Sequence, residues 1–191
     1  LIFPRSQGRD PAAAFQLLKQ RSEEGVIRRY GAISSQARAR LDYELRIIGE
    51  KHFADYFLVV EDIVKQSPRT CGRGSAAASL VSYALGITHV DPLQHDLYFD
   101  RFLNPGRKDP PDIDVDFCWD ERDDILKYVF DTYGETQAAM IANHVTLRLR
   151  AAVREVAKVW GLPAAEIGVR GSTCSSVLNI GPGASGGVRL P

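Results

Sequence analysis

The sequence predicts a fold of the α/β (α+β) class, and two patterns support this prediction. Residues 110–117 alternate Asp with Ile, Val and Phe, which is the period-two pattern of a strand with one buried face. Apolar residues recur at helical spacing on both sides of that segment, in four stretches: 11–24, 41–51, 121–133 and 145–160. Helices are therefore expected to surround a sheet.

The strand expected at 110–117 carries three carboxylates on one face. In an extended strand, Asp112, Asp114 and Asp116 point to the same side with neighbours about 6.6 Å apart, and the apolar residues between them point to the other. Clustered carboxylates repel one another unless a cation lies among them, and Mg²⁺ prefers oxygen ligands. The segment therefore predicts a divalent-metal site. The alternative is an edge strand whose solvated outer face is acidic.

Composition places the chain among globular proteins. Its 191 residues are 45% hydrophobic, enough to bury a core, and 24 basic residues balance 24 acidic ones, so a nucleic-acid partner would need a local patch. Three widely spaced cysteines form neither a disulfide framework nor a zinc pattern, which favours a reducing compartment. With no membrane-length apolar run and no signal peptide, a cytoplasmic protein without a membrane partner is expected.

The individual helices follow from apolar spacing and from glycines at their ends. The helix at 11–24 is expected to end at Gly25. In the stretch 41–51, an apolar stripe begins at Leu41, and Glu44 lies on the opposite, polar side. Residues 56–64 are apolar on nearly all sides, which predicts a buried helix, with a strand as the alternative for so short a run.

Residues 71–86 are expected to form a glycine-rich turn and then a small-residue helix that ends at Gly86. Three residues of the turn are suited to a phosphate. Gly74 would let backbone N–H groups approach an anion at a helix N-terminus. Arg73 supplies a charged guanidinium group that can donate two hydrogen bonds to a phosphate, and Ser75 can cap the helix or bond a phosphate oxygen. The alternative is a capped turn before a packed helix. Together with the acidic strand, the turn indicates a site for a metal-bound nucleotide.

At these motifs the sequence resembles the C-family bacterial DNA polymerases, the family of the DNA polymerase III alpha subunit. The resemblance is carried, in order, by residues 72–77, 84–88, 91–92, 101–105 and 111–117, and it extends from about 41 to about 162. The Pro110-Pro111 pair resembles the error-prone second alpha-subunit homologue, whereas Ala78 matches neither that homologue nor the replicative members, so the choice between them stays open.

The resemblance implies a polymerase-β-like nucleotidyltransferase palm, a mixed sheet flanked by helices, at 1–134. It further implies the start of a helical thumb at 135–166, and the Gly-rich tail at 167–191 is expected to be disordered. In the family's pattern Asp112 and Asp114 hold two Mg²⁺ ions, together with a third carboxylate that this fragment lacks. Gly74 and Ser75 match the pair that binds the incoming triphosphate, whereas Asp116 is not assigned because long-form relatives carry Asn there.

The helix expected at 145–160 separates an apolar from a basic face. The basic face consists of Arg150, Arg154 and Lys158. As the start of a thumb, this face is implied to bind duplex DNA, and an ordinary solvated face is the alternative.

The sequence thus predicts a fragment of a DNA-directed DNA polymerase, which transfers nucleotides from dNTPs to a primer 3′-hydroxyl by two-metal catalysis. The only methionine, Met140, is internal, which indicates a piece of a longer chain, and the fragment alone is expected to be inactive. Expected partners are primer-template DNA and dNTP and, in the longer protein, a sliding clamp and other replisome or repair-polymerase subunits. The alternatives are a standalone nucleotidyltransferase with Asp116 as third metal ligand, and a catalytically inert DNA-binding or assembly module.

Overall fold

A computed structural model of the chain describes residues 10–107 and 109–167. The chain divides into two compact units, Leu1–Ala139 and Met140–Pro191. Most of the tail predicted at 167–191 lies outside the described residues. Among the helices of the described ranges, none has the length and apolar composition that a membrane span requires.

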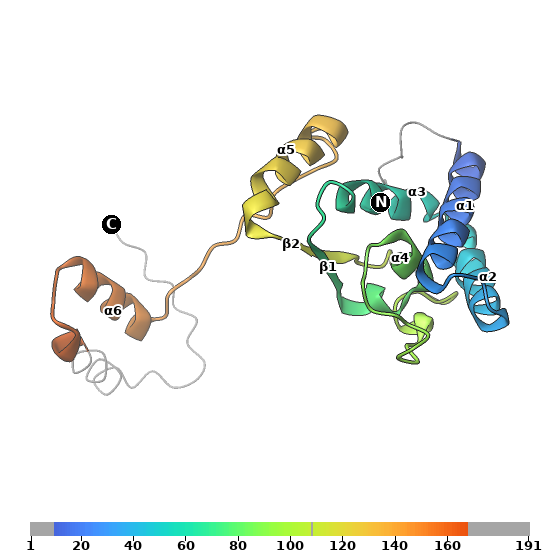
Figure 1. Cartoon of the computed structure of the whole chain (residues 1–191). Coiled ribbons are helices and arrows are strands. Elements are labelled where there is room, and N and C mark those ends of the chain that lie inside the picture. The colour runs from blue at the N-terminus through green and yellow to red at the C-terminus, as the bar shows by residue number, and fades with distance from the viewer. Residues whose placement is uncertain (1–9, 108, 168–191) are drawn as a thin grey trace. The chain divides into compact units, whose positions relative to one another are not determined.

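The first unit consists mainly of helices and contains one small sheet (Figure 1). Its elements are, in order, α1 (Pro11–Tyr30), α2 (Ser35–Glu50), α3 (Ala54–Val64), β1 (Thr70–Arg73), the 3₁₀ helix η1 (Gly74–Ala78), α4 (Leu80–Leu85), η2 (Phe99–Arg101), β2 (Asp114–Phe117), η3 (Trp119–Glu121) and α5 (Arg122–Tyr133). The predicted combination of helices and a sheet is therefore confirmed. In the described ranges, however, the sheet has two antiparallel strands and is not mixed, because other strongly apolar runs, such as 56–64, form helices.

Helix α1 does not end at Gly25, as the sequence predicted, but continues to Tyr30. Gly25 is buried where α1 crosses α4, and a β-carbon at this position would lie 2.2 Å from the carbonyl oxygen of Ala84. Close contact between two backbones thus requires a glycine inside the helix. The helix ends instead at Gly31, whose φ of 80° is accessible to glycine and whose N–H donates to the carbonyl of Ile27.

Replacing Gly25 with Ala is expected to lower the free energy of unfolding by about 1–3 kcal/mol, because the new methyl group would overlap the backbone of α4. Gly49→Ala is the matched control inside α2, since the nearest atoms to its β-carbon belong to the half-buried Phe15 ring, a side chain, whereas those at Gly25 are backbone atoms. The control should be neutral or stabilising by up to about 1 kcal/mol through helix propensity. Urea unfolding followed by circular dichroism would test this, and equal effects of the two changes would contradict it.

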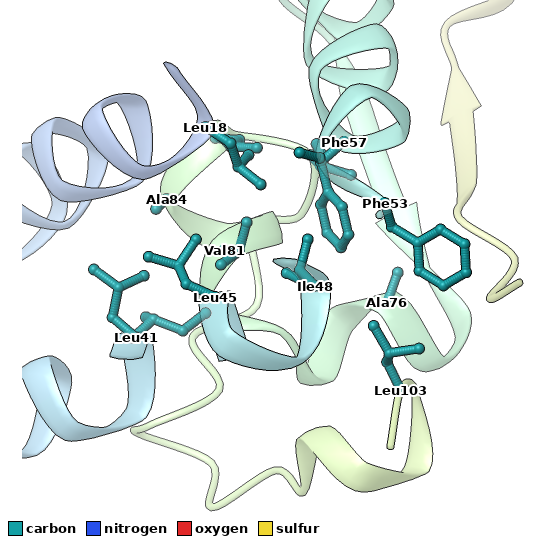
Figure 2. Close-up of a cluster of buried hydrophobic side chains, with 14 of the residues drawn as sticks. Leu18, Leu41, Leu45, Ile48, Phe53, Phe57, Ala76, Val81, Ala84 and Leu103 are labelled. Carbon is teal, nitrogen blue, oxygen red and sulfur yellow. The ribbon is translucent and has the colours of Figure 1, made fainter. Parts of the chain in front are cut away.

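The core of the first unit lies where α1, α2, α3 and α4 meet (Figure 2). Each helix contributes fully buried side chains, for example Leu18 from α1, Leu41 from α2, Phe57 from α3 and Val81 from α4. Residues 56–64 lie in the helix α3, so the helical alternative for this apolar run is confirmed. The segment that connects α3 to β1 therefore begins at the end of a buried helix.

Helix α5 confirms the helix predicted at 121–133, and Gly134 follows it with a φ of 75°. The hydroxyls of Tyr128 and Tyr133 both donate to one oxygen of Asp62 on α3, at 2.7 and 2.8 Å. These hydrogen bonds attach α5 to α3.

The second unit contains α6 (Leu149–Val159), which confirms a helix within the predicted stretch 145–160. Several of its apolar side chains are exposed, including Val156 at 57%, and the following Trp160 is exposed at 80%.

Candidate functional site

The pairing of β1 with β2 brings the glycine-rich turn beside the acidic strand. The strands are antiparallel, with Arg73 opposite Asp114 and Cys71 opposite Asp116. About 40 residues of sequence separate these partners, so the contact is a product of the tertiary fold. The two motifs that together predicted a nucleotide site therefore lie next to each other in one unit.

The acidic strand has the two faces that its alternating pattern predicted. Asp112, Asp114 and Asp116 are exposed. The apolar residues between and after them, Ile113, Val115 and Phe117, are partly buried and pack against the core.

The strand is shorter than the predicted segment 110–117, because β2 begins only at Asp114. Pro110 and Pro111 have no N–H groups to donate to a ladder, and the paired strand β1 has only four residues. Asp112 consequently lies outside the ladder, and its distance from Asp114 is not set by strand geometry.

Gly74 lies close to the acidic strand. A β-carbon built on this residue would lie 2.9 Å from Oδ2 of Asp114. Its φ of 70° is also strained for any other residue. The turn at Gly74 therefore lies close to the carboxylate of Asp114, and its backbone conformation favours glycine.

Arg73 and Asp116 form an ion pair, with Nε 3.0 Å from Oδ1. Both side chains are more than half exposed, at 62% and 59%, so the pair contributes at most about 1 kcal/mol. Asp112 and Asp114 differ from Asp116, because neither forms an ion pair within residues 10–107 and 109–167. In those ranges no group of three His, Cys, Asp or Glu side chains is placed to hold a metal ion together.

Tyr56 contacts this site from α3, a role that the sequence did not predict. The N–H of Ile113, between the two aspartates, donates to the Tyr56 hydroxyl at 3.2 Å. Burial raises the pKa of Tyr56 above its usual 10, and the charges of Asp112 and Asp114 raise it further, against the opposing effect of the hydrogen bond from Ile113. In the sequence Tyr56 is one aromatic residue of an apolar run, and no local signal marks its contact with residue 113.

The helix N-terminus that was expected to hold a phosphate next to Ser75 lies elsewhere. Residues 74–78 form the 3₁₀ helix η1, and α4 begins at Leu80, with the Ser79 side chain as its cap at 3.1 Å from the N–H of Ser82. Ser75 itself is exposed in η1 and caps no α-helix.

A carboxylate of the protein occupies the N-terminus of α4. Glu44 is fully buried, although the sequence placed it on the polar side of α2. It accepts hydrogen bonds from the Ser79 hydroxyl and from the N–H groups of Leu80 and Val81, at 2.8, 2.9 and 3.1 Å. An external anion therefore has no place at this helix end. Gly74 and Ser75 are exposed residues, and their backbone N–H groups remain as the candidate phosphate contacts.

Arg40 supports this buried carboxylate and the end of the turn at the same time. Its Nε lies 2.7 Å from Glu44, and its Nη2 donates to the carbonyls of Ala78 and Leu97, both at 2.8 Å. Burial raises the pKa of Glu44 above its ordinary value of 4.5, while the hydrogen bonds from Arg40, Leu80 and Val81 oppose this shift. The network fixes the C-terminal end of η1.

The predicted DNA-binding residues lie in the second unit. Arg150, Arg154 and Lys158 are exposed on α6, and Lys158 pairs with Glu155 at 2.7 Å. Their spacing of four residues places them along one side of the helix.

Comparisons with known proteins identify the family. The family described as "Bacterial DNA polymerase III alpha NTPase domain" matches residues 16–179. Similar proteins include DNA polymerase III subunit alpha of Borreliella burgdorferi, at 44% identity over 79% of this chain and 14% of the relative. DNA polymerase III subunit alpha of Aquifex aeolicus is 43% identical over 78% of the chain and 13% of the relative. The error-prone DNA polymerase of Pseudomonas syringae is 46% identical over 78% of the chain and 15% of the relative.

The replicative and the error-prone relatives match this chain at similar identities, 43–46%. The chain spans only about one seventh of the length of these relatives. The match to the family covers most of the chain and both motifs of the candidate site. The chain therefore belongs to the family of the bacterial DNA polymerase III alpha NTPase domain, and it is homologous to DNA polymerase III alpha subunits and to error-prone DNA polymerases.

Proposed function

We propose that this chain is the region of a DNA-directed DNA polymerase in which the phosphates of the incoming dNTP meet catalytic Mg²⁺. The reaction would be two-metal transfer of a nucleotide to a primer 3′-hydroxyl. The first unit would be part of a polymerase-β-like palm, and α6 would begin the thumb. Membership of the polymerase family supports the reaction class, and the contact between the turn and the acidic strand supports this location for its chemistry.

The observation that carries the proposal is the contact of Gly74 with Asp114. A nucleotide triphosphate with its bound cation needs N–H donors and carboxylates within a few ångströms of each other, because the cation bridges phosphate and protein oxygens. The β1–β2 register places Arg73 and Gly74 beside Asp114, and all three are exposed. An isolated capped turn or an acidic edge strand would not require this arrangement.

The carboxylates of this site suit Mg²⁺, because Asp112 and Asp114 supply exposed oxygen ligands that no cation within the described ranges neutralises. Bound there, Mg²⁺ would activate the primer hydroxyl and neutralise the departing pyrophosphate. A third carboxylate from outside this chain would complete the site, so the chain alone would not extend a primer.

The other residues of the site would bind and orient the substrate. Backbone N–H groups at Gly74 and Ser75 would donate to phosphate oxygens. Arg73 would move from Asp116 to the triphosphate, and this exchange is cheap because an exposed ion pair contributes at most about 1 kcal/mol. Asp116 would thus hold Arg73 near the site until a nucleotide arrives.

The partners and location follow from the same proposal. Arg150, Arg154 and Lys158 would contact the phosphates of primer-template DNA, where charge matters more than base sequence. In the longer polypeptide, a sliding clamp and other replisome or repair-polymerase subunits would associate with the enzyme in the cytoplasm.

Replacing Gly74 with Ala in the longer polypeptide is expected to raise KM for dNTP by roughly 10–100-fold. The added methyl group would separate Asp114 from the turn and remove a hydrogen bond to a charged phosphate, which contributes about 1.5–3 kcal/mol. Steady-state primer extension at varied dNTP concentration measures this change.

Gly86→Ala is the matched control for this experiment. Gly86 also has a positive φ, of 80°, but a β-carbon there would meet no atom within 4 Å. The control should therefore suffer the same type of backbone strain and keep the normal KM for dNTP. If Gly74→Ala kept the normal KM as well, the turn would not be the phosphate site.

A further inference from the structure

The peptide between Asp112 and Asp114 lies outside the sheet, which raises the question of what holds it in place. The β1–β2 ladder begins at Asp114, and the two residues before Asp112 are prolines, which cannot donate hydrogen bonds. The backbone therefore needs another support to hold Asp112 in a fixed position relative to Asp114.

Helix α3 supplies such a support through Tyr56. The hydroxyl of Tyr56 accepts the hydrogen bond from the N–H of Ile113 at 3.2 Å, and the Ile113 side chain packs against the core. Tyr56 is itself placed by its neighbour Phe57, which is fully buried and whose ring centroid lies 6.3 Å from that of Tyr56. The residue between the two aspartates is thus attached to α3 by its backbone and to the buried core by its side chain.

We propose that Tyr56 is a positioning residue that fixes the spacing of the Asp112 and Asp114 carboxylates for divalent-metal binding. A rotation of the peptide at Ile113 would swing the flanking side chains apart, because they leave the backbone on either side of it. Partners that orient metal ligands in this way commonly change metal affinity by 10–100-fold when they are removed. The inference rests on the proposed function of the two aspartates.

The protonation state of Tyr56 is consistent with this role. A phenol has an ordinary pKa of about 10, so Tyr56 keeps its proton at neutral pH. A neutral hydroxyl accepts the hydrogen bond from Ile113 and adds no further negative charge beside the two carboxylates.

The test is Mn²⁺ binding by the 191-residue chain, followed as the loss of the free-ion signal in electron paramagnetic resonance. Tyr56→Phe keeps the ring and removes only the hydroxyl, and it should weaken Mn²⁺ binding about tenfold. Tyr43→Phe is the matched control, because it removes a phenolic hydrogen bond to Asp100 at 2.6 Å in the same unit, and it should leave Mn²⁺ binding unchanged.

Thermal unfolding of each variant separates positioning from stability. Both Phe variants should unfold within a few degrees of each other, since each keeps its aromatic ring and loses only a phenolic hydroxyl. A tenfold loss of Mn²⁺ affinity in Tyr56→Phe alone would then reflect the metal site. If Tyr56→Phe bound Mn²⁺ normally, or if Tyr43→Phe weakened binding as much, the positioning role would be wrong.

The double variant Asp112→Asn with Asp114→Asn distinguishes this failure from failure of the proposed function. Binding that is saturable in the unsubstituted chain and lost in the double variant supports the metal site, whatever Tyr56→Phe does. Binding that is absent, or that persists in the double variant, would overturn the metal site and the role of Tyr56 together.

Discussion

Replacing Asp114 with Asn in the longer polymerase polypeptide is expected to lower the rate of primer extension by about 10³-fold. The substitution keeps the size and shape of the side chain and removes the negative charge that faces Gly74. Nucleotidyl transfer depends mainly on positioning and charge neutralisation, and the loss of one such group typically reduces rates by about 10²–10³-fold or more. Single-turnover extension of a labelled primer at saturating dNTP would measure the chemical step.

Asp116→Asn is the control on the same strand. Its carboxylate pairs with Arg73, whereas that of Asp114 has no cationic partner within the described ranges. We therefore expect a reduction of less than about tenfold, mostly through weaker dNTP binding, since the exposed pair contributes little energy. An equally large loss in Asp116→Asn would favour Asp116 as a metal ligand, as in a standalone nucleotidyltransferase. Unchanged extension by Asp114→Asn would argue for an inert module.

Patterns that depend on neighbouring residues were predicted well from the sequence. The alternation at 110–117 correctly separates the exposed aspartates from the packed Ile113, Val115 and Phe117, because a side chain's face follows directly from the backbone period. The end of α4 at Gly86 and the end of α5 at Gly134 were likewise predictable, since a positive φ at a helix end is a local requirement.

Features that depend on distant residues were not predicted. Gly25 has the sequence pattern of a helix end, but its role is set by the carbonyl of Ala84, almost 60 residues later. The first residue of β2 depends on the length of β1, and the contact of Tyr56 with Ile113 joins residues 57 positions apart. For the candidate site, the sequence therefore identified the two motifs and predicted that they share one site, whereas their register and the contact with Tyr56 follow only from the fold.

Glu44 shows most clearly how tertiary contacts reverse a local expectation. On α2 it follows Arg40 by four residues, and the same helix carries the pair Arg46 and Glu50 at the same spacing. Arg46 and Glu50 are each more than half exposed, whereas Glu44 is completely buried. The sequence shows two equivalent pairs, and the difference arises because α4 packs its N-terminus onto Glu44.

Replacing Glu44 with Ala is expected to lower the free energy of unfolding by about 3–5 kcal/mol, the range found when one partner of a buried ion pair is removed. The change leaves the N–H groups of Leu80 and Val81 without an acceptor and leaves Arg40 without its counter-charge. Glu50→Ala, in the equivalent but exposed pair, should cost less than about 1 kcal/mol.

Urea unfolding of both variants of the 191-residue chain measures this difference. Glu44→Gln should destabilise the chain by an amount between those of the two alanine variants. Its side-chain amide keeps one acceptor oxygen, but its NH₂ group would face other hydrogen-bond donors. If Glu44→Ala were no more destabilising than Glu50→Ala, water would have to satisfy the freed N–H groups of α4. The N-terminus of α4 would then be open to an external anion, and the proposal that phosphate binds near Gly74 and Ser75 would have a competing site.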